Sequence, residues 1–192
     1  MAAGVTPVLR IIAPALAAVL LVSGCSGGSA DPGTPPVKAA QQQPEDVMFL
    51  QMMLPHHEQG LQMVRMARTR AKNGKVRTLA AAIEATQSTE VTTMKGWLTS
   101  WNQPLTAPAG SHQEHGGMPE TAARLIKGLG GSDAFDRDFL NLMIGHQDDA
   151  VQMAVTESAD GADPEVKEWA HQVEQSRRGQ IKDMLALLKT LR

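Results

Sequence analysis

The sequence predicts an all-α protein: a four-helix bundle built from two repeated helical hairpins that a long connection joins. Three observations indicate this fold. Apolar residues recur in alternating steps of three and four along four long segments, which is the spacing of one helix face. Residues of the first two segments recur ninety positions later in the other two. A short turn separates the two segments of each pair, so each pair should fold as a hairpin.

The first helix should run from about Pro44 to Arg70, with acidic residues in its first turn, where the helix dipole favours them. The residues at the three-and-four spacing are Phe49, Met53, His56, Gly60, Met63 and Ala67. The middle of this inward face therefore holds a histidine where an apolar residue is expected, and His57 follows it. Pro55 removes one backbone donor, so we expect a kink just before the two histidines.

The second helix is predicted from about Val76 to Trp101, after a turn at Asn73-Gly74. Its inward face also turns polar in the middle, at Gln87 and Glu90. Residues equally far from the turn of a hairpin face each other, so His56 should lie level with these two side chains.

The two halves should be connected by a loop from Asn102 to Pro119 and a short helix from Glu120 to Leu129. A third long helix is expected from about Ala134 to Ser158. Asp163 suits the N-cap of the fourth helix and Pro164 its first position, and this helix should end near Leu191.

The internal repeat keeps one constant offset of ninety residues. In the first and third helices the matching pairs are Asp46 and Asp136, Phe49 and Phe139, Leu50 and Leu140, Met53 and Met143, His56 and His146, Gln62 and Gln152, and Met63 and Met153. The offset continues into the second and fourth helices. Two similar hairpins, each with one apolar face, can bury those faces against each other, which favours a four-helix bundle.

Residues 1–25 have the pattern of a secretory signal. Arg10 is the only charged residue among them, an apolar run from Ile11 to Val22 follows, and small residues precede Cys25. The segment resembles a bacterial lipoprotein signal, in which the cysteine becomes the lipidated first residue of the mature protein. Cys25 is the only cysteine and has no disulfide partner in the chain. We therefore expect a lipid anchor on the extracytoplasmic face of the cell membrane, with ordinary secretion as the alternative.

Residues 26–43 are rich in glycine, proline, serine, alanine and glutamine, and such a segment has too few apolar residues to fold. We expect a flexible tether here and the helical domain in residues 44–192. The net charge of −2 indicates no basic surface, so nucleic acid is not an expected partner. A homo-oligomer is left open by the sequence.

A polar layer should cross the middle of the apolar bundle. Its members come from all four helices and are His56, Gln87, Glu90, His146, Arg177 and Gln180. An unpaired buried polar group costs about 1–3 kcal/mol, so these groups must bond one another, water or an ion. Thioethers flank the layer, at Met53, Met63, Met143 and Met153. Imidazole and thioether donors with few carboxylates suit Cu(I) and do not suit Mg²⁺ or Ca²⁺.

Two alternatives use the same residues differently. The 11 methionines can simply fill a core that has 3 Phe, 3 Trp and no Tyr. The polar layer can be a hydrogen-bonded network that fixes helix register, in a bundle that binds a protein or small-ligand partner. A carboxylate di-metal oxidase is disfavoured, because it needs Glu-x-x-His where this chain has Glu84-x-x-Gln87 and Glu174-x-x-Arg177. No nucleophile with a base and an orienting group is evident, so no enzyme activity is expected.

Three motifs together carry a family resemblance: Phe-x-x-x-Met-x-x-His-His at residues 49–57, His-x-x-Met at 115–118, and Phe-Leu-x-x-Met-Ile-x-His followed by Gln-Met-Ala within 139–154. Over about residues 45–188 the chain resembles the family called domain of unknown function 305 (DUF305), a ferritin-like four-helix bundle. The resemblance implies an extracytoplasmic protein, and some members bind copper through Met and His and aid copper tolerance. The ligands that it implies here are Met53, His56, His57, Met63, His115, Met118, Met143, His146 and Met153.

The chain departs from the family pattern at one position. The second half usually carries a histidine pair, and here His146 is followed by Gln147. His112, His115 and Met118 lie in the long connection, where ligands can adapt their geometry, although a solvated polar loop is the alternative. The sequence thus predicts a lipid-anchored, extracytoplasmic protein that binds and buffers copper.

Overall fold

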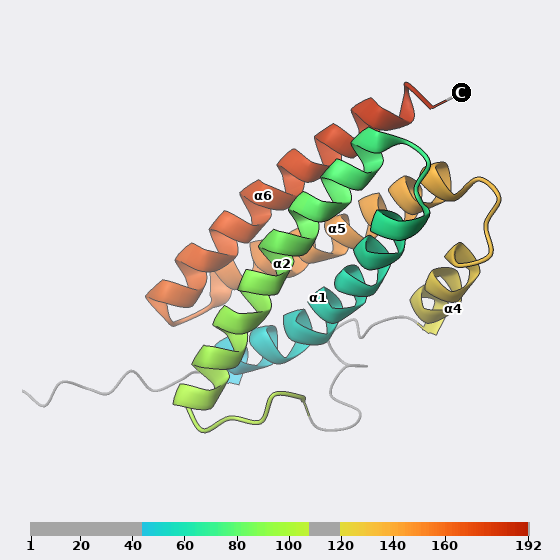
Figure 1. Ribbon diagram of the computed structural model, residues 1–192. Helices are drawn as coiled ribbons and strands as arrows, with labels where there is room; N and C mark the ends of the chain where they lie inside the picture. Colours follow the sequence, from blue (N-terminus) through green and yellow to red (C-terminus); the bar gives the residue numbers. More distant parts are fainter. Residues whose placement is uncertain (1–43, 108–119, 192) are drawn as a thin grey trace, which may run out of the picture. The chain divides into compact units, whose positions relative to one another are not determined.

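The computed structural model describes residues 44–107 and 120–191, and within them the fold is all-α (Figure 1). The helices are α1 (Pro44–Arg70), α2 (Gly74–Ser100), α4 (Glu120–Leu129), α5 (Phe135–Asp160) and α6 (Pro164–Leu188). The four long helices form a four-helix bundle with the short α4 added to it, so the predicted fold class is confirmed. The helices begin and end within about three residues of the predicted positions, and α1 continues through Pro55 as one helix.

Several predictions concern residues outside the described ranges. They are the signal segment with Cys25, the tether, and the connection with His112, His115 and Met118. None of the helices in residues 44–107 and 120–191 has the length and apolar character needed to cross a membrane.

The two hairpins are α1 with α2 and α5 with α6, and α1 packs against α5 across the bundle. One contact, used twice, holds the hairpins in register. Asp46 in the first turn of α1 accepts hydrogen bonds from the backbone N–H groups of Ala162 and Asp163, at 2.9 and 3.1 Å. Asp136 in the first turn of α5 accepts from the N–H groups of Lys72 and Asn73, at 2.9 and 2.7 Å. Each aspartate therefore anchors the turn of the opposite hairpin, and α1 must run antiparallel to α5.

The helices after these turns begin with matching caps. The side chain of Asn73 accepts a hydrogen bond from the backbone of Lys75 at 2.8 Å, and Asp163 accepts from Glu165 at 2.9 Å. Pro164 occupies the first turn of α6, as predicted. Such caps satisfy N–H groups that have no partner inside the helix.

The described core divides into two apolar clusters, one on each side of the polar layer. Met53 belongs to one cluster, with Phe49 and Met94, and its counterpart Met143 belongs to the other. The cluster around Met143 is also covered by Ile126 and Leu129 of α4. The polar layer therefore lies between two well-packed apolar regions, and helices α1 and α5 carry its histidines.

Candidate functional site

His56 of α1 and His146 of α5 meet face to face in the middle of the bundle. Their ring centroids are 3.7 Å apart and the ring planes differ by 6°. Both residues are buried, with 4% and 8% of their surface exposed. The repeat thus brings its two matching histidines together across the α1–α5 contact, as the sequence predicts for a site between them.

Burial sets the protonation state of the pair. It lowers the pKa of His56 well below its usual value, and the adjacent His146 lowers it further. Burial likewise lowers the pKa of His146 to about 3, with the charges of His57 and Arg177 acting in the same direction. Both rings are therefore neutral at neutral pH, which allows them to stack without charge repulsion and leaves a lone pair on each.

Three nitrogens of this histidine pair have no hydrogen-bond partner among the described residues: Nδ1 and Nε2 of His56 and Nε2 of His146. Buried nitrogen atoms usually have hydrogen-bond partners, so three without a partner at one place need an explanation.

Gly60 of α1 lies close to the same histidine pair and limits which side chains fit there. A Cβ atom on Gly60 would lie 2.9 Å from His146 Nε2 and 2.9 Å from Gln87 Nε2, so only glycine fits there without displacement.

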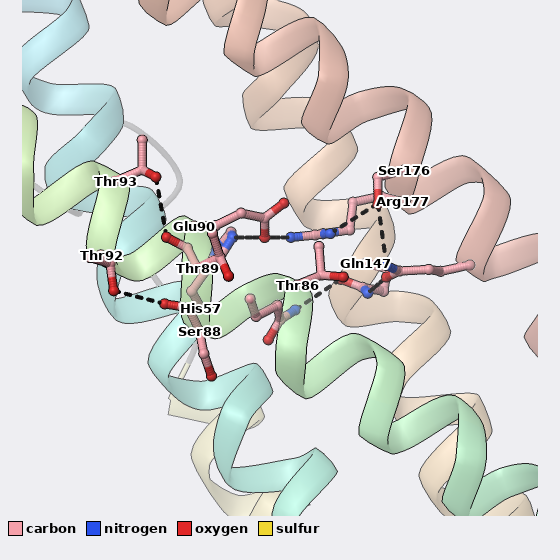
Figure 2. A network of polar contacts seen from close by, with 12 residues as sticks. His57, Thr86, Ser88, Thr89, Glu90, Thr92, Thr93, Gln147, Ser176 and Arg177 are labelled. Carbon is pink, nitrogen blue, oxygen red and sulfur yellow. Dashed lines mark hydrogen bonds and ion pairs between the residues drawn. The ribbon is translucent and has the colours of Figure 1, made fainter.

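His57 has a different environment and belongs to a charged triad with Glu90 and Arg177 (Figure 2). Its Nε2 lies 2.9 Å from Glu90 Oε2 and 3.0 Å from Arg177 Nη2, and Arg177 also donates to Glu90. His57 and Arg177 are fully buried. Burial acts to raise the pKa of Glu90, but the hydrogen bond from His57 and the Arg177 charge together lower it. Glu90 is therefore ionised and paired with Arg177 inside the bundle.

The other half of the repeat replaces this charged triad by three glutamines. Gln147 donates to Gln180, and Gln87 donates to Gln147 at 3.4 Å. At the offset of ninety, Gln147 corresponds to His57, Gln180 to Glu90, and Gln87 to Arg177. All three members of one triad are thus changed together, and neither half is left with an unpaired charge. Figure 2 shows Gln147 beside the charged group.

The predicted thioether ligands occupy three kinds of position. Met53 and Met143 are fully buried, each in one of the two apolar clusters. Met63 is almost as buried and packs with Met143. Met153 is half-buried and lines a cavity between α1 and α5. His115 and Met118 lie outside the described residues.

The donor set of the layer fits a soft ion. Neutral imidazoles and thioethers suit Cu(I) or Ag(I), and the one carboxylate of the layer, Glu90, is already paired. Within the described residues, no group of three or more His, Cys, Asp or Glu side chains is arranged to hold a metal ion, so a site here depends on thioethers. The planes of the stacked His56 and His146 rings are nearly parallel, so their in-plane lone pairs do not converge on one point. One ring must therefore turn before both can bind the same ion.

The family model named domain of unknown function (DUF305) matches residues 46–188. This chain belongs to the DUF305 family. Among solved structures, a DUF305 fragment from Deinococcus radiodurans is 32% identical, covers 78% of this chain and 99% of its own, and has a TM-score of 0.67. The structure described as a putative secreted DUF305 protein from Streptomyces coelicolor is 27% identical, covers 76% of this chain and 93% of its own, and has a TM-score of 0.69.

Another similar structure is that of CopM in its Cu(I)-bound form. It is 28% identical, covers 77% of this chain and 98% of its own, and has a TM-score of 0.66. CopM has also been solved in Cu(II)-bound and Ag-bound forms. No functionally curated protein matches this chain.

Proposed function

We propose that this DUF305 protein binds and buffers copper outside the cytoplasm, through the histidine pair and the methionines around it. One observation carries the proposal: two buried, neutral imidazoles meet where the repeated halves join, and three of their nitrogens have no partner among the described residues. A layer that served only register would be expected to satisfy these atoms. The triads also leave three buried atoms open, His57 Nδ1, Gln87 Oε1 and Arg177 Nε, but each of these side chains is paired through another atom, whereas neither nitrogen of His56 is paired.

The charge balance of the layer favours a soft monovalent ion. The pKa of both histidines is lowered, so an ion has no proton to displace from the pair at neutral pH. The Glu90–Arg177 ion pair and the three glutamines contribute no free negative charge, which hard divalent ions require. Met53 and Met143, one turn before His56 and His146, are the thioethers nearest to them in sequence.

The likeness to CopM supports this ion class, because that relative is solved with Cu(I), Cu(II) and Ag bound. The location rests on residues 1–25 and on the relative described as a putative secreted protein. We propose lipidation at Cys25, which mass spectrometry of the membrane-bound protein tests: the mature chain should begin at Cys25 and carry the added mass of acyl chains there. A membrane-bound protein whose Cys25 is unmodified contradicts the lipid anchor.

A second candidate function has an observation of its own. The charged and amide triads form side-chain networks between different helices, as expected of a layer that sets helix register. In that case the protein is a helical bundle that binds a protein or a small ligand, and copper has no site in the layer. Neither of these two candidate functions gives the polar layer a catalytic role.

A competition titration of Cu(I) against a chelator separates the two functions. We expect binding by the wild type to be much tighter than about micromolar. Binding should weaken at least tenfold in the double variant His56→Ala with His146→Ala. His171→Ala is the matched control, because His171 is exposed and lies on α6 away from the pair. Wild-type binding no tighter than about micromolar removes the buffering function, and unchanged binding by the double variant removes the histidine pair as its site.

A further inference from the structure

A cavity of about 320 Å³ opens between the N-terminal turns of α1 and the last turns of α5. Three methionines line it, namely Met48, Met52 and Met153, together with three acidic residues, Glu45, Glu157 and Asp160. Its volume falls within the range of ligand-binding sites. Met48 and Met52 lie beside the inward face of α1, so the three-and-four spacing of that face does not include them.

The exposure of the methionines separates this group from those that fill the core. Five methionines of the described residues are fully buried or nearly so: Met53, Met63, Met94, Met143 and Met184. Four are half-buried, and three of these four line the cavity, the exception being Met66. A methionine that only fills the core has its sulfur enclosed by other side chains. Here the thioethers gather instead around a space that solvent reaches.

The thioether lining belongs to one half of the repeat only. The counterparts of Met48 and Met52 are Asp138 and Leu142, which line a cavity of about 460 Å³ against α4 that contains no methionine. The counterpart of Glu157 is Ala67. The fold therefore does not need a thioether cavity at this position, since the other half does without one.

Two buried carboxyl groups lie at the same place. Glu157 lines the cavity, and its neighbour is Asp46, whose Oδ1 accepts the hydrogen bonds that hold the turn before α6. The two carboxyl groups are hydrogen-bonded to each other. Such a pair carries one negative charge, which can balance the charge of a cation bound beside it.

We propose that this cavity is a second soft-metal site, separate from the histidine pair, which takes one Cu(I) or Ag(I) ion on Met48, Met52 and Met153. Neutral thioethers bind these soft ions and do not favour Zn²⁺ or Ca²⁺. The ion class rests on the proposed function, whereas the site itself rests on the cavity and its lining. Met52 precedes His56 by one turn of α1, a rise of about 6 Å, so the open site lies close to the buried one.

Nuclear magnetic resonance of methionine methyl groups, enriched in ¹³C, tests the site in the wild-type protein with Ag(I) as a probe that undergoes no redox change. We expect the methyl signals of Met48, Met52 and Met153 to shift as Ag(I) is added. The signals of Met94 and Met184, buried in the core away from the cavity, are the internal controls. Zn²⁺ at the same concentration should leave all these signals in place. The site is overturned if the three cavity methyl signals do not move.

A matched set of variants measures the stoichiometry. Replacing Met48, Met52 and Met153 together by Leu keeps their size and should remove one equivalent of bound Ag(I). Met66→Leu changes the remaining half-buried methionine and should remove none. If the triple variant keeps every equivalent, the site is absent. If it loses an equivalent and the His56→Ala, His146→Ala variant loses none, the cavity site holds and the histidine pair fails. Thermal unfolding of each variant checks that it is folded.

Discussion

At the scale of single residues, Gly60 of α1 leaves the space that His146 of α5 occupies. Gly60 lets the backbone of α1 approach His146 Nε2 and the Gln87 amide so closely that no Cβ fits. This explains a glycine in the middle of a helix, where it is otherwise unfavourable by about 0.5–1 kcal/mol relative to alanine.

Gly60→Ala should therefore destabilise the bundle by about 1–3 kcal/mol, because the added methyl group displaces the histidine or the amide. Gly96→Ala is the control: nothing lies within 4 Å of a Cβ at Gly96, so this variant should gain up to about 1 kcal/mol. Chemical denaturation measures both changes. Equal stability of the two variants would mean that the close approach at Gly60 is not present.

Glu157 supplies a prediction about pH. Burial raises the pKa of its carboxyl group to about 8, and its hydrogen bond and charge interaction with Asp46 contribute in the same direction. The unfolded chain loses this proton near pH 4.5, so between about pH 4.5 and 8 the folded state binds more protons than the unfolded state. The stability contribution of Glu157 is present at low pH and is lost as the pH rises through this window.

In Glu157→Gln, the amide can donate to Asp46 as the protonated carboxyl group does, and it does not titrate. The variant should therefore lose less stability than the wild type between pH 5 and pH 8.5, and above pH 8 it should be the more stable protein. Thermal unfolding across this pH range measures the difference. If the stability of the two proteins changes with pH by the same amount, the prediction is wrong.

At the scale of helices, the charged triad joins α1, α2 and α6, and the amide triad is its counterpart in the other half. Removing Arg177 alone, as in Arg177→Gln, should cost about 3–5 kcal/mol, since Glu90 is then a buried charge without its partner. The triple variant His57→Gln, Glu90→Gln, Arg177→Gln reproduces the amide triad and should recover most of that loss. Denaturation of both variants tests this, and a triple variant less stable than Arg177→Gln contradicts the pairing.

The contacts between hairpins make a similar prediction for α5. Asp136→Ala removes two hydrogen bonds to the turn before α2 and should cost about 1–3 kcal/mol. Amide hydrogen exchange at Lys72 and Asn73 should become faster, because their N–H groups lose the acceptor. Asp148→Ala, at an exposed position of the same helix, is the control and should change neither quantity. Unchanged exchange in Asp136→Ala means that the aspartate does not hold the turn.

At the scale of the whole molecule, the fold could be predicted because its two determinants are visible in one dimension. The three-and-four spacing marks the inward faces, and the constant offset shows that the halves match. The polar layer was predicted for the same reason, and so was the position of Asp163 at the start of α6. The repeated aspartates at 46 and 136 were visible, but their role depends on which turn lies opposite each helix.

The arrangement within the layer could not be predicted in the same way. Arg177 and Glu90 are 87 positions apart, and the sequence shows that they share a layer without showing that they bond each other. The ring stacking of His56 and His146 depends on side-chain rotation, which no spacing specifies. The cavity methionines Met48 and Met52 were missed because they lie beside the inward face of α1. The one pattern in the sequence that could have indicated the cavity is the presence of three methionines and a glutamate in the first turns of α1 and the last turns of α5.

The central claim is that the two neutral histidines, with their methionine neighbours, bind a soft ion inside the bundle. X-ray absorption of the Cu(I)-loaded protein tests it most directly, because the spectrum distinguishes imidazole nitrogen from thioether sulfur around the ion. We expect both kinds of donor in the wild type and loss of the imidazole contribution in His56→Ala with His146→Ala. A wild-type spectrum that contains no imidazole nitrogen, or one that the double variant leaves unchanged, would contradict the claim.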